Sequence, residues 1–298
     1  MKIEKTVMAS VVGRPNVGKS TLLNALVGEK VAIVSSKPQT TRTRITGVVN
    51  RGPCQFVLLD TPGLHRAKSL LGEYMVRIVK STVSQVDLSV MVVEPAPRID
   101  GAEEALIKTL RENGMPAILV VNKIDTVKKE ALFSVIAMYT GAYPFSAVVP
   151  VSAKTGDGLS ILLDEIEKFA MPGPQLFPEG MVSDQPERML LSEIIREKLL
   201  RLLEQEVPHG TAVEITRFST RENGMIDVGA TIFCERESHK GIIIGEKGKM
   251  LKKAGELSRT DMERIFGAKV FLELWVKVKE GWKNDASMMR NFGYDDKS

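Results

Sequence analysis

Short apolar runs alternate with stretches of helical periodicity between Val7 and Phe169. Runs that are apolar throughout are typical of strands buried on both faces of a parallel sheet. The stretches between them repeat apolar residues at the spacing of an amphipathic helix. The alternation predicts an α/β fold with a mostly parallel sheet and helices on both faces. The predicted strands are Val7–Val12, Phe56–Leu59, Leu88–Val93, Ala117–Val121 and Ala147–Val151, and the helices include Ser20–Val27, Leu71–Val79, Ala102–Arg111 and Leu159–Phe169.

The pattern breaks in a segment that reads MPGPQLFPEG from Met171 to Gly180. Proline and glycine at this density interrupt helices and strands, so the segment predicts an interdomain linker. We therefore divide the chain into a first domain at residues 1–171, a linker at 172–180 and a second domain at 181–298.

A different order of elements follows the linker. A helical stripe covers Arg188–Glu206, and two predicted strands are joined by a turn at ENG, residues 222–224. Two helical pieces and a final strand complete an α-β-β-α-α-β order, which predicts a small α+β domain. The remaining elements are strands at Ala212–Phe218 and Met225–Glu235, a short helix ending at Ile242–Ile244, a helix at Gly248–Phe266 and a strand at Val270–Val278.

Composition narrows the class of protein. The chain of 298 residues is long for one core, and its 43% hydrophobic and 26% charged residues are ordinary for soluble globular proteins. The net charge of +4 permits a nucleic-acid or anionic-membrane partner without requiring one. The two cysteines, Cys54 and Cys234, lie far apart and suggest no disulfide framework. No stretch has the length of a membrane span, so we expect a cytoplasmic protein.

The segment from Gly13 to Ser20 reads GRPNVGKS and matches the phosphate-binding pattern G-x-x-x-x-G-K-[ST]. It follows a predicted strand and opens a predicted helix, as the mechanism requires. Glycines let the backbone N–H groups turn toward phosphate oxygens, and the helix N-terminus adds partial positive charge. Lys19 is expected to reach the β- and γ-phosphates, and the Ser20 hydroxyl to bind Mg2+.

Two further motifs indicate a guanine base. NKID at Asn122–Asp125 directly follows a predicted strand, and ligands of such sheets bind beyond the strands' carboxyl ends. The Asp125 carboxylate can accept both the N1–H and the N2 amino group of guanine, whereas adenine has neither donor on that edge. We expect Asn122 to hold the loops together and the Lys123 stem to cover the base. SAK at residues 152–154 is a weaker motif, in which a backbone N–H donated to the base would back up Asp125.

DTPG at Asp60–Gly63 follows another predicted strand. Asp60 is placed to hold Mg2+ through water, and the Gly63 N–H is expected to meet a γ-phosphate oxygen because glycine has no side chain in the way. Between this motif and the phosphate loop, residues 37–44 read KPQTTRTR. A threonine of this segment, for which we select Thr41, would complete the Mg2+ shell. For residues 42–44 a polar surface loop is an equally good interpretation.

With these motifs in this order, the chain resembles translation-factor-class GTPases, and GRPNVGKS together with QTTR at residues 39–42 resembles the Era branch. IIIGEKGK at residues 242–249 is similar to the G-x-x-G signature of a KH domain of type II topology. The resemblance covers essentially the whole chain. It implies a monomer that binds 16S ribosomal RNA near its 3′ end, assists assembly of the 30S subunit and associates peripherally with the inner membrane.

The residues around G-x-x-G support the same interpretation. Five lysines and one acid, Glu246, lie between Ser238 and Lys253. This charge suits phosphates, and a KH loop clamps about four nucleotides of a single strand. Residues 277, 279, 282 and 283 (Lys, Lys, Trp, Lys) would extend the RNA surface or form a solvated basic tail. The predicted RNA-binding residues are Ile244, Gly245, Glu246, Lys247, Gly248, Lys249 and Lys252.

The predicted nucleotide site combines all of these motifs. Its catalytic residues are Lys19, Thr41, Asp60 and Gly63, and its Mg2+ ligands are Ser20, Thr41 and Asp60. The GTP-binding residues are Gly13, Arg14, Pro15, Asn16, Val17, Gly18, Lys19, Ser20, Thr21, Asp60, Thr61, Pro62, Gly63, Leu64, Asn122, Lys123, Ile124, Asp125, Ser152, Ala153 and Lys154.

The hydrolysis step departs from the Ras pattern, because Leu64 stands where Ras has the glutamine that orients the attacking water. Either the neighbouring His65 takes this role, or intrinsic turnover is slow and another cation assists. In relatives of the Era branch an asparagine of the phosphate loop holds a potassium ion. The resemblance therefore implies K+ at Asn16.

Two other classes compete with a GTPase. A small-molecule kinase would also use the phosphate loop, but the motif Asn122–Asp125 argues against it. An RNA-binding assembly factor with a largely inactive nucleotide site is the second alternative. The complete set Lys19, Ser20, Asp60 and Asp125 argues against that.

Overall fold

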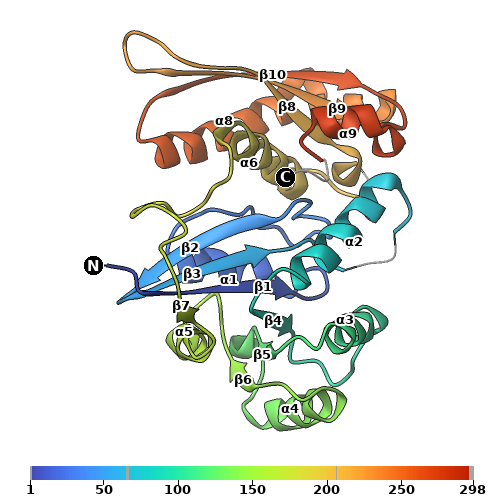
Figure 1. Cartoon of the computed structure of the whole chain (residues 1–298). Coiled ribbons are helices and arrows are strands. Elements are labelled where there is room, and N and C mark those ends of the chain that lie inside the picture. The colour runs from blue at the N-terminus through green and yellow to red at the C-terminus, as the bar shows by residue number, and fades with distance from the viewer. Residues whose placement is uncertain (1, 65–66, 206, 295–298) are drawn as a thin grey trace. The chain divides into compact units, whose positions relative to one another are not determined.

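The computed structural model describes residues 2–64, 67–205 and 207–294 (Figure 1). The chain forms two compact units. The N-terminal unit comprises Met1–Ala32, Thr41–Lys68 and Gly72–Asp184, and the C-terminal unit comprises Ile33–Thr40, Ser69–Leu71 and Gln185–Ser298. The short segment Ile33–Thr40 therefore folds with the C-terminal unit, although residues on both sides of it belong to the N-terminal unit.

The N-terminal unit contains the predicted mostly parallel sheet. Its strands lie in the order β2-β3-β1-β4-β5-β6, and β7 pairs with β1. All neighbours in this order are parallel except β2, which runs antiparallel to β3, and β7 is also antiparallel to β1. The strands are β1 (Lys5–Val12), β2 (Ile45–Arg51), β3 (Cys54–Asp60), β4 (Leu88–Val93), β5 (Ala117–Val121), β6 (Ala147–Pro150) and β7 (Met171–Pro172).

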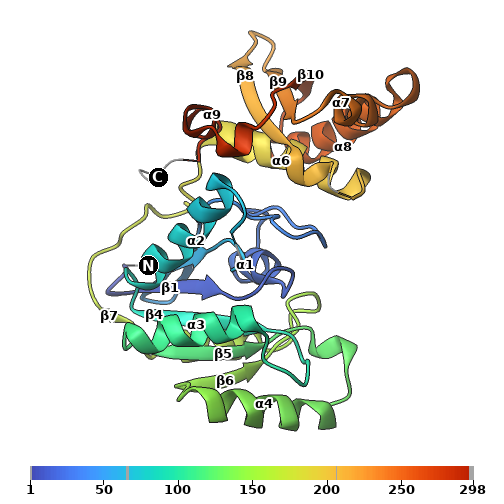
Figure 2. The same cartoon turned by 90° about the vertical axis from the view of Figure 1, so that its right-hand side faces the viewer.

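Helices cover both faces of this sheet, as the sequence predicts. Successive strand residues alternate between two cores: Val90 and Val92 face α1 and α5, whereas Met91 and Val93 face α2, α3 and α4. Figure 1 shows α3 and α5 on opposite sides of the strands, and in Figure 2 α3 and α4 lie on the side toward the viewer. The helices are α1 (Lys19–Val27), α2 (Leu70–Val83), α3 (Gly101–Glu112), α4 (Glu130–Ala142) and α5 (Leu159–Glu167).

The parallel arrangement gathers the predicted motifs at one edge of the sheet. The phosphate loop follows β1, Asp60 ends β3, Asn122 follows β5 and Ser152 follows β6. The carboxyl ends of parallel strands share one edge, which is where such sheets bind their ligands.

The C-terminal unit has the predicted α-β-β-α-α-β order and one additional helix, α9. Its sheet has the order β10-β9-β8, in which β9 is antiparallel to β8 and parallel to β10. The elements are α6 (Glu187–Leu202), β8 (Ala212–Thr220), β9 (Ile226–Cys234), α7 (Glu237–Ile244), α8 (Lys249–Phe266), β10 (Val270–Val278) and α9 (Ala286–Asn291). Short 3-10 segments lie at Ile124–Thr126, Pro208–Gly210, Glu246–Gly248 and Trp282–Asn284.

Trp282 belongs to the core of this unit and not to its surface. The side chain is fully buried, and its Nε1 donates a hydrogen bond to the Gly210 carbonyl at 2.9 Å. The ring packs edge-on against Phe292, with 5.4 Å between ring centroids. The prediction that Trp282 joins an RNA surface or a solvated tail is therefore wrong, because the ring packs into the hydrophobic interior of the C-terminal unit.

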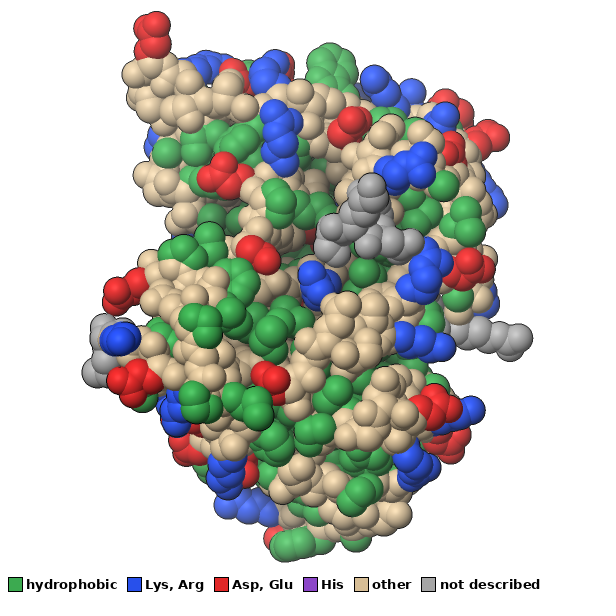
Figure 3. All heavy atoms as spheres, viewed as in Figure 1, with side chains coloured by type: hydrophobic (Ala, Val, Ile, Leu, Met, Phe, Trp, Pro, Cys, Tyr) green, Lys and Arg blue, Asp and Glu red, His purple; other side chains and the backbone are tan. Residues whose placement is uncertain are grey.

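Charged side chains of both signs are interspersed on the face of the molecule that Figure 3 shows. The modest net charge of +4 is not gathered into one continuous basic patch there. Among the helices of the described residues, none is both long enough and apolar enough to cross a membrane.

Candidate functional site

The phosphate loop lies between β1 and α1. Within it, the buried Lys19 side chain turns back onto the loop, where its Nζ donates to the carbonyls of Gly13 at 3.2 Å and Arg14 at 3.0 Å. Burial lowers the pKa of Lys19 to about 8, although the nearby Asp60 charge opposes that shift. Lys19 is thus a buried cation whose protein partners in the described structure include carbonyl oxygens of the loop itself.

Three oxygen-bearing side chains converge beside this lysine. The Ser20 Oγ donates to Asp60 Oδ2 at 2.6 Å, and the Thr41 Oγ1 lies 2.8 Å from Ser20 Oγ and 3.4 Å from Asp60 Oδ2. Asp60 Oδ1 is buried without a hydrogen-bond partner within the described ranges. Burial raises the pKa of Asp60 to about 6, against the opposing charge of Lys19. Hydroxyl and carboxylate oxygens suit a hard divalent cation, so this donor set fits Mg2+.

The DTPG segment lies against the phosphate loop. The Thr61 hydroxyl donates to the Val11 carbonyl at 2.9 Å, and the Leu64 N–H donates to the Gly13 carbonyl at 3.3 Å. A Cβ at Gly63 would lie 2.7 Å from the Pro15 Cα, which is closer than real Cβ contacts. Glycine is therefore required here by the close approach of two loops.

Leu64 is buried, with 9% of its surface exposed, and belongs to the core formed with α2, α3 and α4. An apolar side chain in that position cannot orient a water molecule. The alternative candidate, His65, lies outside the described residues.

The predicted base-binding loops are joined by Asn122. Its Nδ2 donates to the Val17 carbonyl at 2.8 Å, and its Oδ1 accepts from the Ala153 N–H at 3.0 Å. This single side chain connects the phosphate loop with the loops after β5 and β6. The Ser152 hydroxyl donates to Asp125 Oδ1 at 2.7 Å. The SAK segment thus supports Asp125 through a hydroxyl, while the Ala153 N–H is already bonded to Asn122.

The remaining predicted GTP-binding residues surround these groups. Thr21 lies in the first turn of α1, Ile124 begins the 3-10 segment after β5, and Lys154 is exposed. Asn16 is exposed with its backbone in the left-handed region, at a φ of 67°. Pro62 is buried.

Glu94, immediately after β4, is a site residue that the sequence analysis missed. It forms ion pairs with Arg14 of the phosphate loop and with Lys123 of the NKID motif. Lys123 Nζ also donates to the Asn16 carbonyl at 2.7 Å. Burial disfavours the charged form of Glu94, but the two cations outweigh it and hold its pKa below the ordinary value. Its place directly after a predicted strand was the available signal.

The segment before β2 departs from the interpretation as a polar surface loop. Arg42 is only 1% exposed and Thr43 only 8%, whereas Arg44 is exposed. Two of these three side chains are thus part of the packed structure beside Thr41.

In the C-terminal unit, the predicted G-x-x-G loop connects α7 to α8. Gly245 has a φ of 71°, and a Cβ there would lie 2.6 Å from the Met250 Cβ. Only glycine lets the two helices approach this closely. The side chains of Glu246, Lys247, Lys249 and Lys252 are exposed, and Ile244, Gly245 and Gly248 are partly exposed.

A groove runs beside this loop, between α8 and β10. Its volume is about 490 Å3, and its walls include Gly248 and Lys252 from the predicted RNA-binding set. Arg259 contributes a further cation from α8, and Leu272 and Leu274 contribute apolar surface from β10. Glu256 also lines the groove, so its walls carry two cations, one acid and apolar surface that includes Phe271. A basic groove with an aromatic side chain suits a single-stranded nucleic acid.

These observations define a class of protein: a P-loop GTPase joined to a KH domain. A sequence profile described as 50S ribosome-binding GTPase matches residues 8–123, and one described as KH domain matches residues 206–283. GTPase Era of Ruminiclostridium cellulolyticum is 47% identical over 290 residues, which cover 97% of each chain. GTPase Era of Clostridioides difficile is 48% identical over 295 residues, which cover 98% of this chain and 99% of the relative.

Solved structures agree over the same length. Aquifex aeolicus Era bound to GDP.AlF4- has a TM-score of 0.94 at 38% identity and covers 97% of this chain and 99% of its own. Era in complex with MgGDPNP and nucleotides 1506-1542 of 16S ribosomal RNA has the same score and identity and covers 98% and 99%. The chain belongs to the GTPase Era family. It is a GTP-hydrolysing enzyme with a KH domain, which excludes the small-molecule kinase.

Proposed function

We propose that this protein is a GTP-driven switch that binds 16S ribosomal RNA near its 3′ end and assists assembly of the 30S subunit. One observation carries the proposal, which is the full-length likeness to Era in complex with MgGDPNP and nucleotides 1506-1542 of 16S ribosomal RNA. The profile matching residues 8–123 refers in its description to the 50S ribosome. That profile does not include the KH domain, so the full-length relatives are the better guide to the RNA.

The phosphate loop and Lys19 bind the nucleotide phosphates in this proposal. Backbone N–H groups of residues 13–18 face the phosphate oxygens, and the buried Lys19 exchanges its loop carbonyls for β- and γ-oxygens. Ser20, Thr41 and Asp60 hold Mg2+, which when bound neutralises charge on those oxygens. The Gly63 N–H donates to the γ-phosphate. Water attacks the γ-phosphorus in line with the leaving GDP, and the products are GDP and inorganic phosphate.

The base is selected by Asp125. Its carboxylate accepts the N1–H and N2 amino group of guanine, and the hydroxyl of Ser152 holds one of its oxygens. The Lys123 stem covers the ring while its ammonium is bound by Glu94 and the Asn16 carbonyl. A partly buried network of this kind favours one geometry of the base loops before the ligand arrives.

Asn16 would hold a potassium ion, which would supply the further cation for hydrolysis. The buried, apolar Leu64 supports this proposal, because it takes the place of a water-orienting glutamine. Asn16 is exposed in the phosphate loop, where its side-chain carbonyl can bind a monovalent cation. Such an ion stabilises the charge that develops on the phosphates in the transition state.

RNA binds at the G-x-x-G loop and the groove between α8 and β10. The exposed Lys247, Lys249 and Lys252 meet the phosphates, while the glycine backbone of the loop admits the strand closely. A monomeric state and peripheral association with the inner membrane are further predictions from the resemblance.

Crosslinking of the full-length protein to cellular RNA, in GTP or in GDP, followed by sequencing tests this function. The expected crosslinks map to the 3′ end of 16S RNA and to lysines of residues 244–252. Crosslinks spread over many RNAs without enrichment of 16S RNA would contradict the proposal. Multiple turnovers of phosphate release, measured in the same preparation, distinguish a working GTPase from an assembly factor with a largely inactive site.

A further inference from the structure

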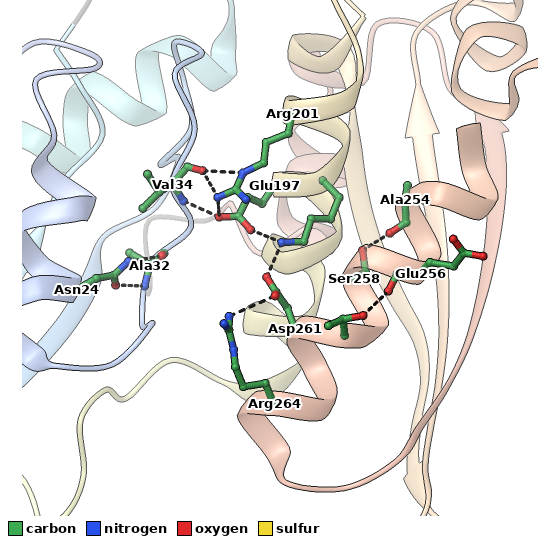
Figure 4. Close-up of polar contacts among 12 residues, drawn as sticks. Asn24, Ala32, Val34, Glu197, Arg201, Ala254, Glu256, Ser258, Asp261 and Arg264 are labelled. Atoms are coloured by element: carbon green, nitrogen blue, oxygen red, sulfur yellow. Dashed lines mark hydrogen bonds and ion pairs between the residues drawn. The ribbon is translucent and has the colours of Figure 1, made fainter. Parts of the chain in front are cut away.

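The segment Ile33–Thr40 lies between two anchors in the nucleotide-binding unit. On its N-terminal side, the Asn24 Oδ1 accepts a hydrogen bond from the Ala32 N–H at 2.8 Å (Figure 4). On its C-terminal side, Thr41 contacts Ser20 at 2.8 Å. The segment itself nevertheless packs with the C-terminal unit. The segment is therefore joined directly to Thr41 of the nucleotide site, whereas its own contacts lie in the C-terminal unit.

Helix α6 binds one end of this segment through both the backbone N–H and the backbone carbonyl of Val34. Glu197 Oε1 accepts from the Val34 N–H at 2.9 Å, and Arg201 Nη2 donates to the Val34 carbonyl at 3.0 Å. Arg201 also pairs with Glu197 at 3.0 Å, which closes the ring of contacts seen in Figure 4. Glu197 is fully buried, so its charge is tolerated only while these partners are in place.

The same helix binds the other end of the segment through Arg196. This guanidinium is 1% exposed and is oriented by Glu193. It donates to the carbonyl of Gln39 at 3.3 Å and also to the carbonyl of Thr40. The Thr40 carbonyl belongs to the peptide that joins Thr40 to Thr41. Arg196 therefore holds the peptide group that directly precedes a proposed Mg2+ ligand.

A second set of contacts leads from Glu197 to α8. Its other oxygen, Oε2, accepts from Lys198 Nζ at 2.7 Å, and the same ammonium pairs with Asp261 of α8. Asp261 in turn accepts from Arg264 at 3.2 Å (Figure 4). Glu197 thus divides its two oxygens between the backbone of Val34 and a bridge to the helix that begins immediately after the G-x-x-G loop.

We propose that this network on α6 couples the nucleotide site to the RNA-binding helix. Arg196 and Glu197 respond to the position of Ile33–Thr40 because both bind its backbone. The ion pair between Lys198 and Asp261 links Glu197 to α8. Because Glu197 and Arg196 are buried charges, loss of their partners is costly, and we expect the network to change between discrete arrangements and not gradually. A nucleotide that favours one position of Thr41 then favours one arrangement of α8. This inference rests on the proposed binding of RNA at the G-x-x-G loop.

The test uses the full-length protein and an RNA matching the 3′ end of 16S RNA. Its Kd is measured with GDP and with a non-hydrolysable GTP analogue. We expect the wild type to show at least about a fivefold difference and Glu197→Gln less than about a twofold difference. Without RNA, hydrogen exchange over residues 33–40 and 249–266 should depend on the nucleotide in the wild type and lose that dependence in the variant.

Matched variants make the result specific. Glu187→Gln makes the same chemical change at an exposed position of α6 and should keep the wild-type ratio. Arg201→Gln removes the contact to Val34 from a side chain that is 51% exposed, so this variant should fold even if Glu197→Gln does not. Its Kd ratio then tests the coupling in place of Glu197→Gln. A wild-type Kd ratio retained in Arg201→Gln would overturn the coupling role and leave RNA binding intact. Absence of RNA binding in the wild type would overturn both this inference and the proposed function.

Discussion

At the scale of single residues, Glu94 shows how one carboxylate can organise two loops that are far apart in sequence. It pairs with Arg14 of the phosphate loop and with Lys123 of the base motif. Arg14 is also held by the buried Glu103, whose carboxylate caps the start of α3. The phosphate and base loops therefore share Glu94 as a counterion, and loss of its charge leaves the cations of Arg14 and Lys123 without the carboxylate that lies between them.

Glu94→Gln should destabilise the fold by about 1 kcal/mol at neutral pH. This value is smaller than that of a buried ion pair, because Glu94, Arg14 and Lys123 are all partly exposed and solvent screens their charges. The folded-state pKa of Glu94 lies below its ordinary value of 4.5. Its contribution is therefore present above pH 4.5 and is lost as the pH falls through the lower, folded-state pKa. Denaturant unfolding of wild type and variant should converge at acidic pH. This role would be refuted if the difference in unfolding free energy between wild type and Glu94→Gln stayed the same at acidic pH. It would also be refuted if Glu104→Gln, at an exposed position, lost as much stability as Glu94→Gln.

Asp125→Asn should change the base that the site accepts. The amide presents a donor where guanine also has a donor, whereas xanthine has a carbonyl at that position and fits. Sites built around hydrogen bonds discriminate strongly, so GTP affinity should fall at least about 100-fold while the affinity for XTP rises. Competition binding with both nucleotides measures the change. Unaltered GTP affinity in the variant would show that another residue reads the base.

Hydrolysis should be faster in potassium than in sodium at equal ionic strength. The expected difference is at least about tenfold, because a cation at Asn16 stabilises transition-state charge. In Asn16→Ala the difference should disappear while both salts still support slow turnover. Equal ionic strength separates the specific ion from general screening. Identical wild-type rates in the two salts would exclude the potassium site and leave the GTPase assignment intact.

At the scale of elements, helical periodicity identifies only those helices that bury one stripe. Helix α4 reads EALFSVIAMYTGA, with apolar residues on every side, and the sequence analysis did not detect it. Only Val135 and Tyr139 of that helix are buried, and Phe133 is 75% exposed. Strand β2 was missed for a related reason: its apolar residues are interrupted by Thr46 and Gly47, and its pairing with β3 at the edge of the sheet defines it.

The G-x-x-G loop between α7 and α8 permits a sharp test of the RNA site. Replacement of both Glu246 and Lys247 by aspartate places negative charge where the phosphate backbone should pass. Lys247 has a φ of 51°, a conformation that aspartate tolerates, so the loop should keep its fold. RNA affinity should fall at least about tenfold and GTP affinity should not change.

The matched control is Lys108→Asp, which also removes a lysine charge but lies on α3 at a side chain that is 75% exposed. Wild-type RNA affinity should decrease with added salt, because phosphate contacts release counterions. Normal RNA binding by the loop variant would place the RNA site elsewhere on the chain.

At the scale of the whole molecule, the boundary between the two units does not follow the chain. Ile33–Thr40 and Ser69–Leu71 are N-terminal in sequence but pack with residues 185–298. Asn284 of the C-terminal unit, for example, accepts from the Leu70 N–H at 3.1 Å. Both segments adjoin stretches that carry nucleotide motifs. If RNA affinity depends on the nucleotide, thermodynamic reciprocity requires RNA to shift nucleotide affinity by the same factor.

The sequence by itself determined the features whose physical cause is local. A glycine-rich turn before a helix predicts a phosphate loop, and buried strands ending in DTPG and NKID predict the metal and base loops at one edge of a parallel sheet. The order of elements and G-x-x-G likewise predicted the second domain. Each of these inferences depends on spacing within a few residues or on a rule of sheet topology.

Only the tertiary structure decided which distant residues complete those sites. Glu94 acquires its role because it pairs with both the phosphate loop and the base loop. Trp282 is buried because its ring packs against Phe292 and its Nε1 donates to the Gly210 carbonyl. The contact of Glu197 with Val34 joins residues separated by 163 positions, and that of Lys198 with Asp261 joins residues separated by 63. Charge pairing and burial depend on distance in space, which local spacing does not encode.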